Sequence, residues 1–125
     1  MQMDVDSFRQ FCLSFPHATE KLQWGEELCF KVGGKIFAMI GLGSVPQSVV
    51  FKCAPETFAE LTEREGITPA PYVGRYKWVR LERLDVVPGF ELQDLVRQSY
   101  EMVAAKAATD RKPARQPSIK PRRRT

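Results

Sequence analysis

The segment of the sequence best suited to binding chemistry is a run of cations interrupted by aromatic residues. Its nine residues hold four cations and one acid: Arg75-Tyr76-Lys77-Trp78-Val79-Arg80-Leu81-Glu82-Arg83. Because Lys and Arg neutralise phosphates and an indole ring stacks on a base, this pattern indicates a surface that lies along a nucleic acid. The alternative interpretation is a sheet edge whose charges prevent it from pairing with another chain.

Strand alternation predicts a second candidate site on an open face of the sheet. The residues that we expect to share this face are Lys31, Lys52, Trp78 and Arg80, together with Ile36, Ala38 and Ile40. Cations around an indole ring fit phosphates and a stacked base, although Glu82 is expected on the same face. The competing interpretation is a solvated face on which lysine stems shield one tryptophan.

The net positive charge of the chain comes from its C-terminal tail. Residues 110–125 hold seven Lys and Arg and one acid, a net charge of +6, whereas residues 1–109 hold 12 basic and 14 acidic residues, a net charge of −2. We therefore expect a domain over 1–109 and a flexible basic tail over 110–125, because the tail has too few apolar residues to form a core. Its cations, among them Arg122, Arg123 and Arg124, suit non-specific phosphate contacts or serve only solubility.

The familiar motifs for catalysis and metal binding are missing from the sequence. The chain has one histidine and three widely spaced cysteines without a C-x-x-C pair, and it lacks the common glycine-rich phosphate-binding and nucleophile motifs. We therefore expect no catalytic residue, no metal, no cofactor and three buried cysteines. The alternative is a site near Trp24 that uses His17 and nearby acids, or a metal site on the acidic helix over 55–65.

Neither a membrane span nor a signal peptide is expected. No apolar run reaches the roughly 18 residues that a span needs, and the N-terminus is acidic without an apolar stretch. We expect a cytoplasmic protein without a membrane partner. A monomer is the default expectation, and the sequence leaves the oligomeric state open.

The hydrophobic pattern places the candidate residues on a small number of elements. Helices are predicted over 4–15, 55–65 and 90–107, and strands over 28–32, 35–42, 49–53 and 76–84, with a possible short strand over 19–24. Gly33-Gly34 is expected to turn a hairpin in which Val32, Phe30 and Leu28 oppose Lys35, Phe37 and Met39. Residues 68–71 are expected to break regular structure. This order predicts an α+β fold with helices on one face of an antiparallel sheet.

Several short segments occur in an order and spacing that point to a known family. They are Phe15-Pro16, Trp24-Gly25, Phe30 to Ala38, Lys52-Cys53, Pro55-Glu56, Pro69-Ala70-Pro71-Tyr72, Tyr76-Lys77-Trp78-Val79 and Ser99-Tyr100-Glu101 with Lys106. Over about residues 6–107 the chain resembles the MmcQ/YjbR family. The resemblance implies a fold similar to CyaY and frataxin, with a curved antiparallel sheet, and the DNA binding with which the family is commonly labelled. Many members have a histidine just before the Trp78 position, where this chain has Lys77.

Taken together, the sequence predicts a small DNA-binding protein without enzymatic activity. Basic strand residues and the tail are expected to carry the binding: Lys31, Lys52, Arg75, Lys77, Trp78, Arg80, Arg83, Arg122, Arg123 and Arg124. The expected partner is DNA or another polyanion. The alternative is a protein-interaction or small-ligand module that uses the open sheet face around Trp78.

Overall fold

The helices and strands follow the predicted order, with one additional short strand over Ile67–Pro69. The computed structural model describes residues 3–43, 45–71 and 73–115. The helices are α1 (Val5–Leu13), α2 (Pro55–Leu61) and α3 (Gly89–Arg115), and the strands are β1 (Thr19–Gln23), β2 (Glu27–Val32), β3 (Lys35–Gly41), β4 (Ser48–Lys52), β5 (Ile67–Pro69) and β6 (Trp78–Leu81). Two short 3₁₀ helices, η1 (Gly74–Tyr76) and η2 (Leu84–Val86), flank β6.

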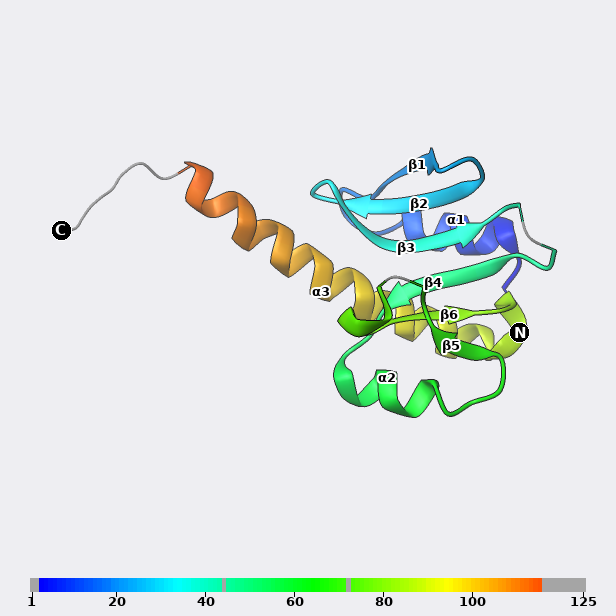
Figure 1. Ribbon diagram of the computed structural model, residues 1–125. Helices are drawn as coiled ribbons and strands as arrows, with labels where there is room; N and C mark the ends of the chain where they lie inside the picture. Colours follow the sequence, from blue (N-terminus) through cyan, green and yellow to red (C-terminus); the bar gives the residue numbers. More distant parts are fainter. Residues whose placement is uncertain (1–2, 44, 72, 116–125) are drawn as a thin grey trace.

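The strands form one antiparallel sheet in the order β1-β2-β3-β4-β6-β5. Helices α1 and α3 pack on one face, and α2 lies beside the end of the sheet that β6 and β5 form (Figure 1). Within the described residues, no helix covers the opposite face, which we call the open face. The predicted α+β fold, with helices on one face of an antiparallel sheet, is therefore confirmed.

Alternate strand residues and one stripe of each long helix form the core. Fully buried side chains meet at the centre of this core: Phe8, Phe30, Ile40, Phe51 and Leu92. The rings of Phe8 on α1 and Phe30 on β2 contact each other edge to face, with 5.9 Å between their centroids. Because burial of such side chains drives folding, the helix-facing side of the sheet is fixed by its large apolar residues.

The hairpin of β2 and β3 differs from the prediction in its register. Gly33 and Gly34 adopt positive φ angles (59° and 80°), and Val32 pairs with Lys35 as expected. One extra residue, Phe37, then bulges from β3, so that the expected pairs of Phe30 with Phe37 and of Leu28 with Met39 are wrong. The observed pairs are Phe30 with Ala38 and Leu28 with Ile40.

The bulge exists because Phe37 packs against aromatic side chains outside the sheet. Its ring contacts Phe15 and Tyr100 at centroid distances of 5.8 Å and 5.2 Å, and Phe37 is fully buried. An inserted residue reverses the alternation beyond it. Ala38 and Ile40 therefore face the core, and Met39 lies on the open face.

A serine hydroxyl from α3 completes the sheet at the bulge. The pairing of β3 with β4 ends at Ala38 and Phe51, so Phe37 and Lys52 would be the next opposed residues. The fully buried Ser99 hydroxyl lies between them instead: it donates to the Phe37 carbonyl oxygen (2.6 Å) and accepts from the Lys52 N–H (3.0 Å). One side chain therefore satisfies two backbone groups that the interrupted ladder leaves without their usual partners.

Several element boundaries differ from the prediction. The possible strand over 19–24 is present as β1. The prediction that residues 68–71 lack regular structure is wrong, because β5 ends at Pro69; a proline is tolerated there because β5 is an edge strand. β6 is shorter than predicted because η1 and η2 replace its ends. α3 continues past residue 107 to Arg115, since the Ala-rich stretch 104–108 favours helix, so residues 110–115 of the expected flexible tail are helical.

The Ser99 bridge gives a prediction about stability. Ser99→Ala should lower the free energy of unfolding by about 2 kcal/mol or more, because it leaves the Phe37 carbonyl and the Lys52 N–H without their partner. Urea denaturation measures the change. The control is Ser14→Ala, which removes an exposed local hydrogen bond to Phe11 and should change stability by less than about 0.5 kcal/mol. Equal effects of the two substitutions would contradict the bridging role.

Candidate functional site

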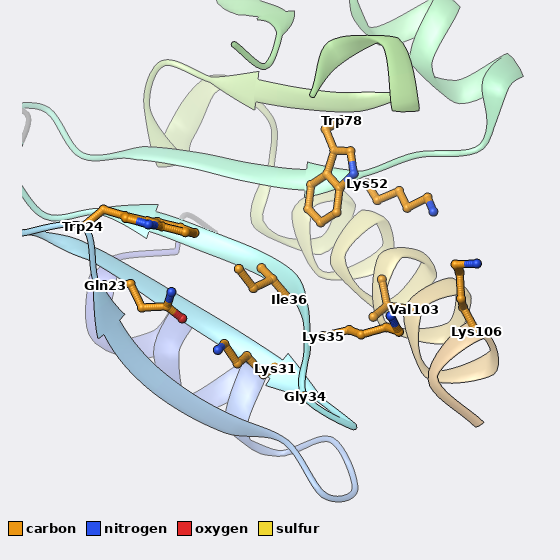
Figure 2. A pocket seen from close by; sticks show the side chains of 10 residues that line it. All are labelled: Gln23, Trp24, Lys31, Gly34, Lys35, Ile36, Lys52, Trp78, Val103 and Lys106. Carbon is orange, nitrogen blue, oxygen red and sulfur yellow. The ribbon is translucent and has the colours of Figure 1, made fainter. Parts of the chain in front are cut away.

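A pocket on the open face brings together side chains from β1, β2, β3, β4, β6 and α3. We call it the lysine pocket; its volume is about 400 Å³. Four lysines and two tryptophans line it: Lys31, Lys35, Lys52, Lys106, Trp24 and Trp78. Figure 2 shows them around the space between the ends of β3 and β4, with α3 behind.

Strand pairing and helical periodicity explain how these side chains meet. Lys52 and Trp78 are partners across β4 and β6, and Lys31 lies on the same face of β2. Val103 and Lys106, one turn apart on α3, line the pocket where β3 and β4 separate. The pocket therefore occurs at the place where the bulge interrupts the ladder and Ser99 bridges the two strands.

The lysine pocket is positively charged. No acidic residue lines it, and Lys31, Lys52 and Lys106 form no ion pair within the described part of the chain. Cations gathered in a concave surface with low-dielectric walls raise the local concentration of anions. This arrangement fits a ligand with several negative charges and an aromatic group that can stack on an indole ring.

One acceptor in the lysine pocket has no partner. The side-chain oxygen of Gln23 is buried and accepts no hydrogen bond from any described residue. Figure 2 shows the Gln23 amide at the pocket wall, near Lys31. A buried acceptor without a donor raises the free energy of the protein.

A second hollow adjoins the first, and we call it the apolar pocket. Its volume is about 540 Å³, and its lining is mainly apolar: Trp24, Met39, Val50, Ala70, Pro71 and Val73, with Ser48, Glu27 and Arg80. Met39 and Val50 are partners across β3 and β4, and Val50 and Arg80 across β4 and β6. Trp24 lines both pockets, so the two hollows adjoin each other on the open face.

Part of the predicted open face is confirmed, and part is wrong. Lys31, Lys52 and Trp78 meet in the lysine pocket, with Ile36 beside them, and Arg80 lines the apolar pocket. The expectation that Ala38 and Ile40 share this face is wrong, because the bulge at Phe37 turns both into the core, where they are fully buried. Glu82 follows the end of β6 and forms an ion pair with Arg83.

The other predicted cations lie outside both pockets, and each described one has a partner. The Arg75 guanidinium lies over the Tyr76 ring (4.8 Å), and the Lys77 ammonium lies over the Phe58 ring (5.1 Å). Arg83 forms ion pairs with Asp85 and Glu82. Arg122, Arg123 and Arg124 lie outside the described residues.

The family model described as YjbR matches residues 13–102. The chain belongs to the YjbR family. No curated protein matches it significantly.

Two solved structures resemble this YjbR protein. The crystal structure of DR2400 from Deinococcus radiodurans, described as a DUF419 domain, is 29% identical, with a TM-score of 0.77 over 96% of this chain and 94% of that one. A structural genomics target from Pseudomonas syringae is 17% identical, with a TM-score of 0.66 over 81% of this chain and 99% of the other. At that identity the second match shows the shared fold alone.

Sequence reasoning missed six residues of the lysine pocket as site residues: Gln23, Trp24, Gly34, Lys35, Val103 and Lys106. Lys106 was part of the family resemblance, and Lys35 follows the Gly33-Gly34 turn, but neither signal indicates a place on the open face. Lys106 enters the pocket only because α3 passes the gap between β3 and β4. No local pattern reports such a contact between a helix and the far face of a sheet.

The alternatives near Trp24 and on α2 can be compared with the structure of this YjbR protein. Glu20 accepts a hydrogen bond from Arg9 (2.8 Å), which lowers the pKa of Glu20, and His17 is exposed with a φ of 62°. Among the described residues, no group of three or more His, Cys, Asp and Glu side chains lies close enough to hold a metal ion. No helix of the described chain is both long and apolar enough to cross a membrane.

All three cysteines of the YjbR protein are buried, as predicted. Cys12 and Cys53 lie in the core, and Cys29 faces the other side of the sheet but is equally inaccessible. Burial raises the pKa of each thiol, to about 12 for Cys53. Because the thiolate is the nucleophile, these groups are poorly suited to covalent catalysis.

Thiol labelling tests the burial of the cysteines. At pH 8 about one Cys53 thiol in ten thousand is ionised if its pKa is about 12, so Ellman's reagent should react very slowly with the native protein. In urea it should label all three cysteines rapidly. Fast labelling of even one thiol in the native protein would show that the cysteine is accessible and more reactive than its burial allows.

Proposed function

We propose that this protein binds nucleic acid on the open face of its sheet, with an unpaired nucleotide in the lysine pocket. The observation that supports this proposal is the grouping of four lysines around Trp24 and Trp78 in one hollow. The lysines match the phosphates of a strand, and the indole rings match the faces of its bases.

The shape of the site favours a single strand over a duplex. Trp78 is half-buried within the pocket, so a base must leave its own stack to reach the indole ring. Single-stranded nucleic acid offers free base faces, whereas a duplex offers them only at its ends. A duplex would instead lie on an outer surface, where Arg75, Lys77 and Arg83 are its nearest candidates for phosphate contacts.

In this proposal the tail is a second source of affinity for nucleic acid. Arg122, Arg123 and Arg124 belong to a segment with a net charge of +6, and the domain over 1–109 has a net charge of −2. Attraction of a polyanion at a distance is therefore due mainly to the tail, and the lysine pocket would select an unpaired nucleotide after encounter.

A small-ligand function is the second candidate, and the pocket volume favours it. The volume of the lysine pocket, about 400 Å³, lies within the range of small-molecule sites. A free nucleotide would therefore fit in it and contact the same lysines and indole rings. Competition distinguishes the two functions: a free mononucleotide that displaces a bound oligonucleotide at equal concentration would favour the small-ligand function.

Substitution of single lysines tests the proposed function. Lys31→Gln or Lys52→Gln should weaken binding of a fluorescent single-stranded oligonucleotide, measured by anisotropy. Each should also reduce the slope of log affinity against log salt by roughly 0.7, because one phosphate contact is lost.

The matched control is Arg97→Gln, which removes the same charge from α3 near Phe11, outside both pockets. Its salt slope should remain that of the wild type. If Arg97→Gln weakened binding as much as Lys31→Gln and Lys52→Gln do, net charge alone would explain the binding. The absence of any anisotropy change for the wild type at low ionic strength would refute the proposal.

A further inference from the structure

The two pockets on the open face lie one step apart along the same strands. The lysine pocket contains the Lys52–Trp78 pair of β4 and β6, and the apolar pocket contains the next pair on that face, Val50–Arg80. Two residues along a strand span about 6.8 Å. This distance is about twice the 3.4 Å rise between stacked nucleotides, so one flat ring fits between two neighbouring bases at this spacing.

Trp24 is the residue that separates the pockets. It lines both of them, and 69% of its surface is exposed. Its φ of 49° is unusual for a bulky residue, and the turn between β1 and β2 holds it there.

The two pockets differ in chemistry in a way that distinguishes phosphate from base. The lysine pocket is lined by four lysines and no acid, whereas the apolar pocket is lined by one cation, Arg80, and one acid, Glu27, so that its formal charges cancel. Apolar side chains such as Met39 and Val50 accept the face of a base. The phosphates of a strand therefore belong near the lysines, and one of its bases belongs in the apolar pocket.

We infer that the lysine pocket and the apolar pocket are consecutive subsites for two neighbouring nucleotides of one strand, with the Trp24 ring between their bases. This inference rests on the proposed function and gives it a unit of recognition, the dinucleotide. The carboxylate of Glu27 in the apolar pocket favours a base that presents N–H donors. Guanine presents two such donors side by side, and thymine presents one between two carbonyls.

Dinucleotides that lack one base test the two subsites. The probes are pGpG and its two isomers with an abasic residue at either position, which keep the phosphate charge unchanged. Binding is followed by fluorescence of Trp24 and Trp78, the two tryptophans of the chain. Stacking contributes enough per base that pGpG should bind at least about five-fold more tightly than either abasic isomer.

A bulky substitution assigns the bases to the pockets. Val73→Phe narrows the apolar pocket. In this variant, loss of one of the two bases should no longer weaken binding, whereas loss of the other should still weaken it. Leu22→Phe adds a ring on β1 outside both pockets, and it should keep the dependence on both bases. The two-subsite inference would be overturned if the affinity of Val73→Phe still depended on both bases, or if the affinity of the wild type depended on neither.

Base preference supplies a separate test of Glu27. The wild type should bind pGpG at least about five-fold more tightly than pTpT, and Glu27→Gln should reduce that ratio. An unchanged ratio in Glu27→Gln would contradict the assignment of a base edge to Glu27.

A longer oligonucleotide separates failure of this inference from failure of the proposed function. One possible result is that a (TG)₃ hexanucleotide binds and Lys52→Gln weakens its binding, while both abasic dinucleotides bind as tightly as pGpG. In that case the two-subsite inference fails, but the proposed nucleic-acid binding stands. If neither the hexanucleotide nor pGpG binds at low ionic strength, the proposed function fails as well.

Discussion

The hydroxyl group of Ser99 lies where three parts of the fold meet, and the rest of the architecture depends on its two hydrogen bonds. It bridges the Phe37 carbonyl and the Lys52 N–H, which the bulge in β3 leaves without the usual ladder partners. The bridge ties α3 to the centre of the sheet and keeps β3 and β4 together at the point where their pairing stops. A fully apolar side chain at this position would leave two backbone groups unsatisfied.

The same interruption accounts for the candidate site. Because β3 and β4 separate beyond the Ser99 bridge, side chains from α3 reach a hollow on the face of the sheet that no described helix covers. Lys106 thereby joins Lys31, Lys35 and Lys52, although α3 packs on the opposite face. A domain with a net charge of −2 over residues 1–109 can in this way hold a strongly positive pocket, since charge placement rather than net charge sets the local potential.

The aromatic residues divide into two groups with different roles. Phe15, Phe37 and Tyr100 form a packed cluster, in which the Phe15 and Tyr100 rings are stacked at 4.4 Å, and this cluster explains the bulge. Trp24 and Trp78 remain at the open face with surface available to a ligand. The groups differ in ring type, since the packed cluster holds phenyl and phenol rings and the open face holds indole rings, and they differ in what surrounds them.

The sequence by itself determined the order of the helices and of every strand except β5, the fold class, the Gly33-Gly34 turn, the burial of the cysteines and the family. These follow from local periodicity, from glycine conformations and from short motifs, all of which act within a few residues. Lys31, Lys52 and Trp78 were also placed on one face correctly, because simple alternation holds where each of them lies. Only the tertiary structure decided the bulge at Phe37, the reversal of Ala38 and Ile40, the strand β5 and the entry of Lys106 into the pocket. Each of these depends on contacts between residues far apart in the chain, which local patterns do not encode.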